Sequence, residues 1–269
     1  MTLSKGRGMK PEQRRELIVQ LVETLGEVHV DALAERYGSS RETIRRDLSA
    51  LDASGRLRKF HGGARGIAAP GEPGLTEGPL DARLATLRVE KDAIGQRAAT
   101  LFGEGATLFV DTGSTTIAFA RALARRRGLT VISNSPQIAT ALAQSDGRHR
   151  LYLLGGEIAA EGRETLGALA IQQLQQFRAE HAVLTIGAMT PDGIMDYDLR
   201  ETELARAMIA RAASVTVLAD HSKLDRAAVF EVASLGSIDR LVTDRAPSPE
   251  MGAALRSAGV EVIVAPVGR

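Results

Sequence analysis

Arginine is concentrated in residues 39–64, where the spacing of apolar residues predicts a short helix followed by a hairpin. Ser40 can cap that helix, and Ile44, Leu48 and Leu51 recur at spacings of four and three, which places them on one face. Guanidinium groups on the opposite face can hydrogen-bond guanine O6 and N7 or neutralise phosphates. We therefore expect DNA contacts from Ser40, Arg41, Glu42, Thr43, Arg45 and Arg46.

The segments around this helix predict a winged helix-turn-helix. Upstream, an apolar stripe over 17–25 predicts one helix, and Asp31 is expected to cap a second helix that ends at Gly38. Downstream, residues 57–61 alternate as a strand, and Gly62-Gly63 permits a tight return. The wing residues expected at the DNA backbone are Arg58, Lys59 and His61. For the histidine, packing under the hairpin is the alternative.

The distribution of charge weighs against a solvated surface helix, which is the alternative for an isolated pair of arginines. Residues 1–66 hold 13 Lys and Arg against 9 Asp and Glu, whereas the remainder holds 21 against 24. The excess positive charge therefore lies in the part predicted to read DNA. Which arginine reads a base and which contacts a phosphate stays open.

A second group of polar residues follows the predicted strands of the C-terminal part. The run from Asp111 to Thr116 opens a helix, so backbone N–H groups and hydroxyls can converge there on an anion. It lacks the patterns of a P-loop and of a dinucleotide site, and an ordinary capped turn is the alternative. Other strand ends are also polar, which suits a small phosphorylated sugar or polyol. The residues expected to bind this effector are Asp111, Gly113, Ser114, Thr115, Thr116, Asn134, Gly155, Gly156, Asp220 and Lys223.

These residues must be positioned by strands and helices that alternate along the chain. Such alternation predicts an α/β domain with a mostly parallel sheet covered on both faces, where ligands bind at the carboxyl ends of the strands. The expected strands are 107–110, 129–132, 151–154, 182–186, 215–218, 241–242 and 260–264. The expected helices lie near 90–101, 115–127, 136–145, 167–177, 201–213 and 248–258.

A linker is expected at 66–82, because four Pro and Gly residues fall between positions 70 and 74. It would separate a winged helix-turn-helix domain at 1–65 from an effector domain at 83–269, and a chain of 269 residues is long enough for both. The absence of cysteine excludes disulfides and thiolate metal sites, and the scattered histidines predict neither a metal site nor a cofactor. An aromatic content of 3% argues against stacking platforms for single-stranded nucleic acid.

The sequence resembles the DeoR family of bacterial transcriptional regulators over nearly its whole length. In the DNA-binding part the resemblance rests on the run from Glu42 to Leu48, Leu51, Gly55 and the run from His61 to Ala64. In the effector part it rests on Lys91, Ile94, Asp111-x-Gly113-Ser114-Thr115-Thr116, Asn134-Ser135, Gly155-Gly156, Gly167 and Asp220-x-Ser222-Lys223.

The resemblance implies a fold related to ribose-5-phosphate isomerase and the CoA transferases. It also implies an effector that is a phosphorylated sugar or polyol, with glycerol 3-phosphate as the leading candidate. The chain departs from the family pattern at Ser39, Ala159-Ala160 and Leu224-Asp225, and the last two departures bear on effector choice.

We therefore predict a DNA-binding transcriptional regulator, in the simplest case a repressor that a sugar phosphate releases from its operator. The alternative is an isomerase-like enzyme with an accessory nucleic-acid-binding domain. Its acid-base groups would be Asp111, Asp196, Asp198, Glu201, Asp220 and Lys223. Such an enzyme has no use for a complete DNA-reading module, and a fold alone confers no activity. An NAD-dependent protein lacks its fingerprint.

The expected partners are double-stranded operator DNA, the effector and further copies of the chain. A homodimer or homotetramer is predicted because a single winged helix gives limited affinity, and the helix near 88–101 is a candidate for subunit contact. Residues 1–10 are polar, and nowhere do 18 apolar residues without charge occur together. We therefore expect a cytoplasmic protein without membrane association.

Overall fold

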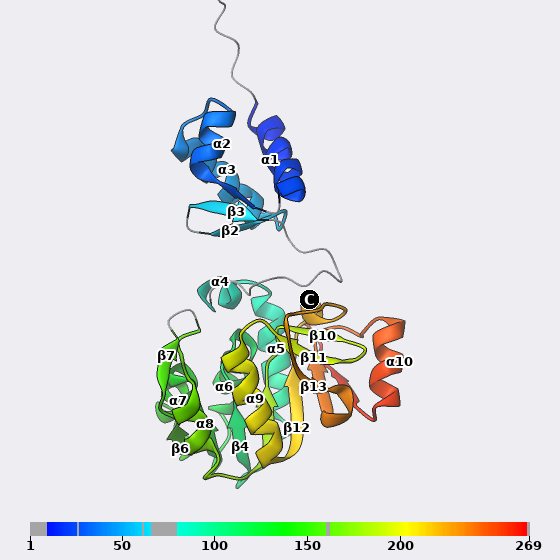
Figure 1. The fold of residues 1–269 in the computed structure, drawn as a ribbon. Helices are drawn as coiled ribbons and strands as arrows, with labels where there is room; N and C mark the ends of the chain where they lie inside the picture. Colours follow the sequence, from blue (N-terminus) through cyan, green and yellow to red (C-terminus); the bar gives the residue numbers. More distant parts are fainter. Residues whose placement is uncertain (1–9, 26, 61, 66–79, 160–161, 268–269) are drawn as a thin grey trace, which may run out of the picture. The chain divides into compact units, whose positions relative to one another are not determined.

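The computed structural model describes residues 10–25, 27–60, 62–65, 80–159 and 162–267. The chain divides into two compact units, Met1–Ala69 and Pro70–Arg269 (Figure 1). The expected wing residue His61, and residues 66–79 of the expected linker, lie outside the described ranges. Helix α4 begins at Leu80, inside the segment assigned to the linker.

The first unit contains three helices and a small antiparallel sheet with strand order β1-β3-β2. Its elements are α1 (Pro11–Leu25), β1 (Glu27–His29), α2 (Val30–Arg36), α3 (Arg41–Ala53), β2 (Arg58–Phe60) and β3 (Gly63–Arg65). The apolar face of α3 is buried as its spacing predicts, with Ile44 and Leu48 fully enclosed beside Ile18 of α1. Gly63 is required at the wing, since a Cβ there would lie 2.2 Å from the carbonyl oxygen of Val28.

One predicted helix cap is present and one is wrong. Ser40 caps α3, because its Oγ accepts a hydrogen bond from the backbone N–H of Thr43 at 3.1 Å. Asp31 does not cap α2: the helix begins at Val30, and His29 holds the capping position without a side-chain bond. The reason is that β1 leads directly into the helix, which therefore starts before Asp31. That carboxylate instead pairs with the Nε of Arg41 at 2.7 Å.

A buried carboxylate ties α3 to α1. Asp47 is 2% exposed, and its two oxygens accept hydrogen bonds from Arg14 Nε at 2.6 Å and Arg15 Nε at 2.9 Å. A buried charge is tolerated only when it is paired and hydrogen-bonded, so this contact fixes how α3 lies against α1. The sequence pattern places Asp47 beside the apolar face but gives no sign of its partners.

The second unit is built on a seven-stranded parallel sheet with the order β15-β14-β12-β9-β4-β5-β6. Its strands are β4 (Thr107–Val110), β5 (Thr130–Ser133), β6 (Arg150–Leu153), β9 (Ala179–Leu184), β12 (Ala212–Leu218), β14 (Arg240–Thr243) and β15 (Glu261–Val264). Each overlaps an expected strand. The predicted α/β class with a mostly parallel sheet is therefore confirmed.

Helices cover both faces of this sheet. They are α4 (Leu80–Ala85), α5 (Arg88–Ala99), α6 (Ser114–Leu123), α7 (Pro136–Ala143), α8 (Ala168–Leu174), α9 (Leu199–Arg211) and α10 (Pro249–Ser257). On the central strand β4, Leu108 and Val110 join the apolar cluster of α5, α6 and α7, whereas Phe109 joins that of α8 and α9. Much of α5, the candidate for subunit contact, packs inside this unit: a Cβ at Gly95 would lie 2.7 Å from the backbone of α6.

Short antiparallel elements supplement the main sheet and were not predicted, because none of them contains a continuous apolar run of four residues. They are the hairpin β7 (Glu157–Ala159) and β8 (Glu164–Leu166), and the sheet of β10 (Ala188–Thr190), β11 (Gly193–Asp196) and β13 (Phe230–Ser234). Two 3-10 turns, His221–Lys223 and Leu235–Ser237, complete the unit. In the described part of the chain, no helix has the length and apolar character needed to cross a membrane.

Candidate DNA-binding surface and effector pocket

The outer face of α3 carries the arginines that the sequence predicts there. Arg41, Arg45 and Arg46 are exposed, and the side chain of Arg46 is 80% exposed with its Nε 3.8 Å from Glu42. Exposed ion pairs of this kind contribute little to stability. These guanidinium groups can therefore exchange their present contacts for phosphates or base edges.

The wing is hydrogen-bonded to α3 through Lys59, one of the residues predicted to contact DNA. Lys59 donates from its Nζ to Ser49 Oγ at 2.8 Å, and its backbone N–H donates to Asp52 Oδ1 at 3.2 Å. Arg58, the preceding residue of β2, is exposed. The structure thus places Lys59 against α3 and leaves Arg58 exposed on β2, and the third wing residue, His61, lies outside the described residues.

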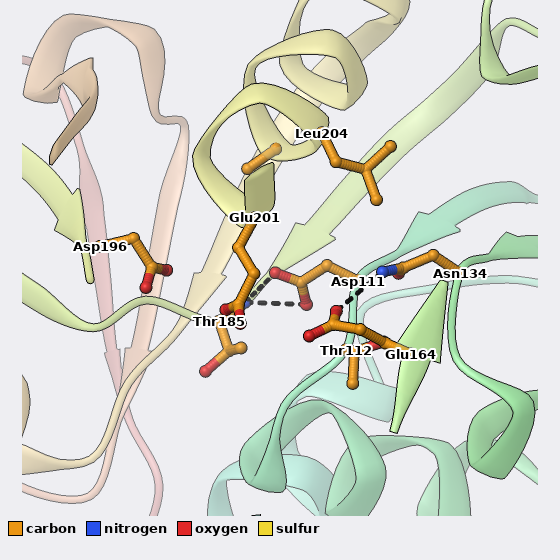
Figure 2. A pocket seen from close by; sticks show the side chains of 9 residues that line it. Asp111, Thr112, Asn134, Glu164, Thr185, Asp196, Glu201 and Leu204 are labelled. Atoms are coloured by element: carbon orange, nitrogen blue, oxygen red, sulfur yellow. Dashed lines mark hydrogen bonds between the residues drawn. The ribbon is translucent and has the colours of Figure 1, made fainter. Parts of the chain in front are cut away.

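The second unit has a pocket at the carboxyl ends of neighbouring parallel strands. In the strand order, β4 is flanked by β5 on one side and β9 on the other, and the chain winds in opposite directions from this point. Ligands of open α/β sheets bind at such a switch point. The residues that line the pocket are Asp111, Thr112, Asn134, Glu164, Thr185, Asp196, Glu201, Leu204 and Ala205 (Figure 2).

The carboxyl groups dominate the electrostatics of this pocket. Burial raises the pKa of Asp111 well above its ordinary value, nearby carboxylates add to the rise, and the hydrogen bond from Thr185 opposes it. The backbone N–H of Thr185 lies 3.0 and 2.9 Å from the two oxygens of Asp111. Burial also raises the pKa of Glu164, against the lowering effect of bonds from Glu201 and Asn134.

The run from Gly113 to Thr116 lies where the sequence predicts it, at the start of α6. Ser114, Thr115 and Thr116 are buried, and the hydroxyl of Thr116 donates to the carbonyl of Gly113 at 3.1 Å. Gly113 is required by packing, because a Cβ would lie 2.1 Å from Cγ2 of Thr185. None of these four residues lines the pocket, whose wall from this segment is Asp111 and Thr112.

Four other expected effector residues lie away from the pocket wall. Gly155 and Gly156 precede the β7–β8 hairpin, where the N–H of Gly155 donates to Gln173 Oε1 at 2.9 Å. Asp220 is 1% exposed and caps the turn that contains Lys223, accepting from Ser222 N at 3.0 Å and from Ser222 Oγ. The carboxylate of Asp220 therefore acts as the cap of this turn.

A buried lysine connects Asp220 to α4. Lys91 is 5% exposed, and its Nζ donates to the carbonyl oxygens of Arg83 at 2.7 Å and Thr86 at 2.9 Å. The same Nζ lies 3.8 Å from Asp220 Oδ2. Carbonyls at the end of a helix lack partners within it, so the lysine satisfies the end of α4 while it balances the charge of Asp220.

The sequence predicted Asp111 and Asn134 in the pocket but not several of the other residues that line it. Glu164 reaches it from the hairpin β7–β8 and Thr185 from the end of β9, and neither belongs to a recognisable motif. Asp196 and Glu201 were considered only as acid-base groups of the enzyme alternative. Within the described ranges, no group of three or more His, Asp or Glu side chains is arranged to hold a metal ion.

Comparison with known proteins matches two family models to separate parts of the chain. Residues 14–69 match the DeoR-like helix-turn-helix domain, and residues 87–245 match the DeoR C-terminal sensor domain. The glycerol-3-phosphate regulon repressor of Escherichia coli K12 is 33% identical over 240 residues, which cover 89% of this chain and 93% of the relative. The transcriptional repressor AccR of Agrobacterium fabrum is 34% identical over 235 residues, or 87% and 89% of the two chains.

Among solved structures, ribose-5-phosphate isomerase A from Methanocaldococcus jannaschii aligns with a TM-score of 0.36 and 17% identity. That alignment covers 50% of this chain and 53% of the isomerase.

A helix-turn-helix unit with exposed arginines, joined to an α/β sensor unit with a polar pocket, defines a ligand-responsive DNA-binding regulator. Several relatives that cover most of the chain are named transcriptional repressors, so the regulator interpretation is favoured over the isomerase alternative. The chain belongs to the DeoR family of transcriptional regulators.

Proposed function

We propose that this regulator represses transcription by binding operator DNA and leaves the DNA when a small phosphorylated sugar or polyol occupies the sensor unit. The observation that carries the proposal is the outer face of α3, where three exposed arginines lie opposite a fully buried apolar face. Glycerol 3-phosphate is the first effector to test, since a repressor named for that compound is similar over 89% of this chain. A cytoplasmic location is part of this proposal, because operator DNA is the proposed partner.

The proposed contacts divide between the two units. Operator DNA is contacted by Ser40, Arg41, Glu42, Thr43, Arg45, Arg46, Arg58, Lys59 and His61. In the sensor unit, Asp111 and Asn134 bind effector hydroxyls, while the start of α6 and Lys223 attract the phosphate. A homodimer or homotetramer presents two or more winged helices to the half-sites of an operator. Sedimentation that finds only monomers at operator-binding concentrations would contradict the oligomer.

Replacing Arg46 by alanine is expected to weaken operator binding by about 1–3 kcal/mol, because a base or phosphate contact is lost. The measurement is an anisotropy titration of DNA flanking the protein's own gene at two salt concentrations. Arg125→Ala is the matched control, since it removes an exposed arginine from the sensor unit. Effector affinity should be unchanged in both variants, and its loss in Arg46→Ala would contradict the division of labour.

The effector is tested in the same titration by adding glycerol 3-phosphate and then a panel of sugar phosphates. Release of specifically bound protein by one compound supports the proposal and names its effector. Specific binding that no compound changes would contradict the effector part alone. Binding that depends on salt but not on DNA sequence would contradict the operator-binding part, because phosphate contacts carry no sequence information.

A further inference from the structure

We propose that Glu164 is a specificity-determining residue of the effector pocket. Together with Glu201 it forms an acid-lined end that accepts hydroxyl or ammonium groups of the effector and rejects a carboxylate. The inference rests on the proposed function, because it specifies which phosphorylated compounds the sensor unit accepts.

The lining of the pocket consists mainly of hydrogen-bond acceptors. Four of its nine residues are carboxylic acids, and none of the nine is Lys, Arg or His. The acids are Asp111, Glu164, Asp196 and Glu201. A ligand group that enters this end must therefore donate hydrogen bonds, whereas an anionic group would be repelled by the ionised carboxylates there.

One buried polar atom at this end, Asn134 Oδ1, has no hydrogen-bond partner among the described residues. Asn134 is 1% exposed, and its Nδ2 donates to Glu164 Oε2 at 2.9 Å and to the carbonyl of Thr165 at 3.3 Å. Both of those atoms are acceptors, which fixes the orientation of the amide and leaves its Oδ1 without a hydrogen bond. Buried polar groups are nearly always satisfied, so an acceptor left open indicates a missing donor.

Glu164 and Glu201 form the part of this end that a donor can bridge. Both side chains line the pocket, and the contact with Glu201 lowers the pKa of Glu164. Glu164 lies on β8 and Glu201 on α9, so the contact joins two separate elements. An ammonium group can donate to both carboxyl groups at once, and a hydroxyl can donate to one of them. A carboxylate from the ligand cannot.

The nearby cation does not change this conclusion. Arg83 of α4 acts on Glu164 and lowers its pKa, but Arg83 is not among the residues that line the pocket. Arg83 therefore balances the negative charge of Glu164 and does not bind the ligand. The phosphate of an effector must then lie outside the acid-lined end.

The experiment is isothermal titration calorimetry on the full chain. The compounds tested are phosphorylated and differ in the group at the end opposite the phosphate. The three-carbon series is glycerol 3-phosphate, 3-amino-2-hydroxypropyl phosphate and 3-phosphoglycerate. The six-carbon series is glucose 6-phosphate, glucosamine 6-phosphate and 6-phosphogluconate. In at least one series, we expect the hydroxyl and ammonium compounds to bind about tenfold or more tighter than the carboxylate, because of like-charge repulsion.

The variant Glu164→Gln removes the charge at constant size and is expected to reduce that preference by about tenfold. Glu201→Gln should do the same, and its half-buried position makes it the second variant should Glu164→Gln fail to fold. Glu203→Gln is the matched control, since Glu203 is exposed on α9 and does not line the pocket. The Glu203→Gln variant should prefer the hydroxyl and ammonium compounds over the carboxylate as strongly as the unmodified protein does.

Three outcomes decide the proposal. Equal binding of carboxylate and hydroxyl compounds to the unmodified protein would overturn it while leaving the proposed function intact. A preference that both glutamine variants retain would overturn the roles of Glu164 and Glu201. If none of the six compounds binds any of the proteins, the proposed effector class fails, and this inference fails with it.

Discussion

Replacing Asp47 by alanine should lower the free energy of unfolding of the DNA-binding unit by about 3 kcal/mol, because breaking a buried ion pair leaves charge uncompensated. The carboxylate is the shared partner of Arg14 and Arg15, and Arg14 is itself 7% exposed. A domain of this size has only a few kcal/mol of stability, so operator binding should fall with folding. Hydrogen exchange on the full chain measures the effect, and protection of α1 and α3 should fall by about 100-fold.

The sensor unit provides an internal reference in that experiment, because its amides should keep their protection. Glu35→Ala is the control variant, since Glu35 is an exposed acidic residue of α2. It removes the same charge without opening a buried pair. A loss of less than about 1 kcal/mol in Asp47→Ala would show that the contact acts like an ordinary surface pair.

Replacing Lys91 by methionine should lower the stability of the sensor unit by about 3 kcal/mol, for a related reason. The variant leaves the carboxylate of Asp220 buried without this cation, and it removes the donor to the carbonyls of Arg83 and Thr86. For a unit of this size, the midpoint of thermal unfolding should fall by roughly 6–12 °C. Calorimetry on the full chain measures the shift.

The matched control for Lys91→Met is Arg88→Met, on the same helix. The side chain of Arg88 is 72% exposed, so its loss removes a positive charge without creating a buried defect. A shift of less than about 2 °C is expected there. Equal shifts in the two variants would mean that the buried contacts of Lys91 add nothing to stability.

The DNA-binding unit could be predicted in detail because its signals are local. The cap at Ser40, the apolar spacing on α3 and the glycines of the wing each act within a few residues. What could not be predicted depends on distant residues. Asp47 is satisfied by Arg14, 33 residues away in the sequence, and Asp31 lost its capping role because a three-residue strand precedes α2.

The sensor unit shows the same limit at its pocket. Alternating apolar runs predicted the sheet, and the rule that ligands bind at carboxyl ends of strands located Asp111 and Asn134. Glu164 was missed because it reaches the pocket from a short hairpin, and its bond to Asn134 spans 30 residues. Asp220 was expected to face a ligand, but the local turn and Lys91 engage its carboxylate.

The position of Lys91 couples the packing of α4 to the environment of Asp220 and Lys223. One ammonium group holds the end of α4, the helix that begins inside the expected linker, and also balances Asp220 beside Lys223. When two interactions share one group, each changes the free energy of the other by the same amount. A compound that strengthens the contact between Lys91 and Asp220 therefore changes the equilibrium constant for the packing of α4 on the unit. The packing of α4 changes the affinity for that compound by the same factor.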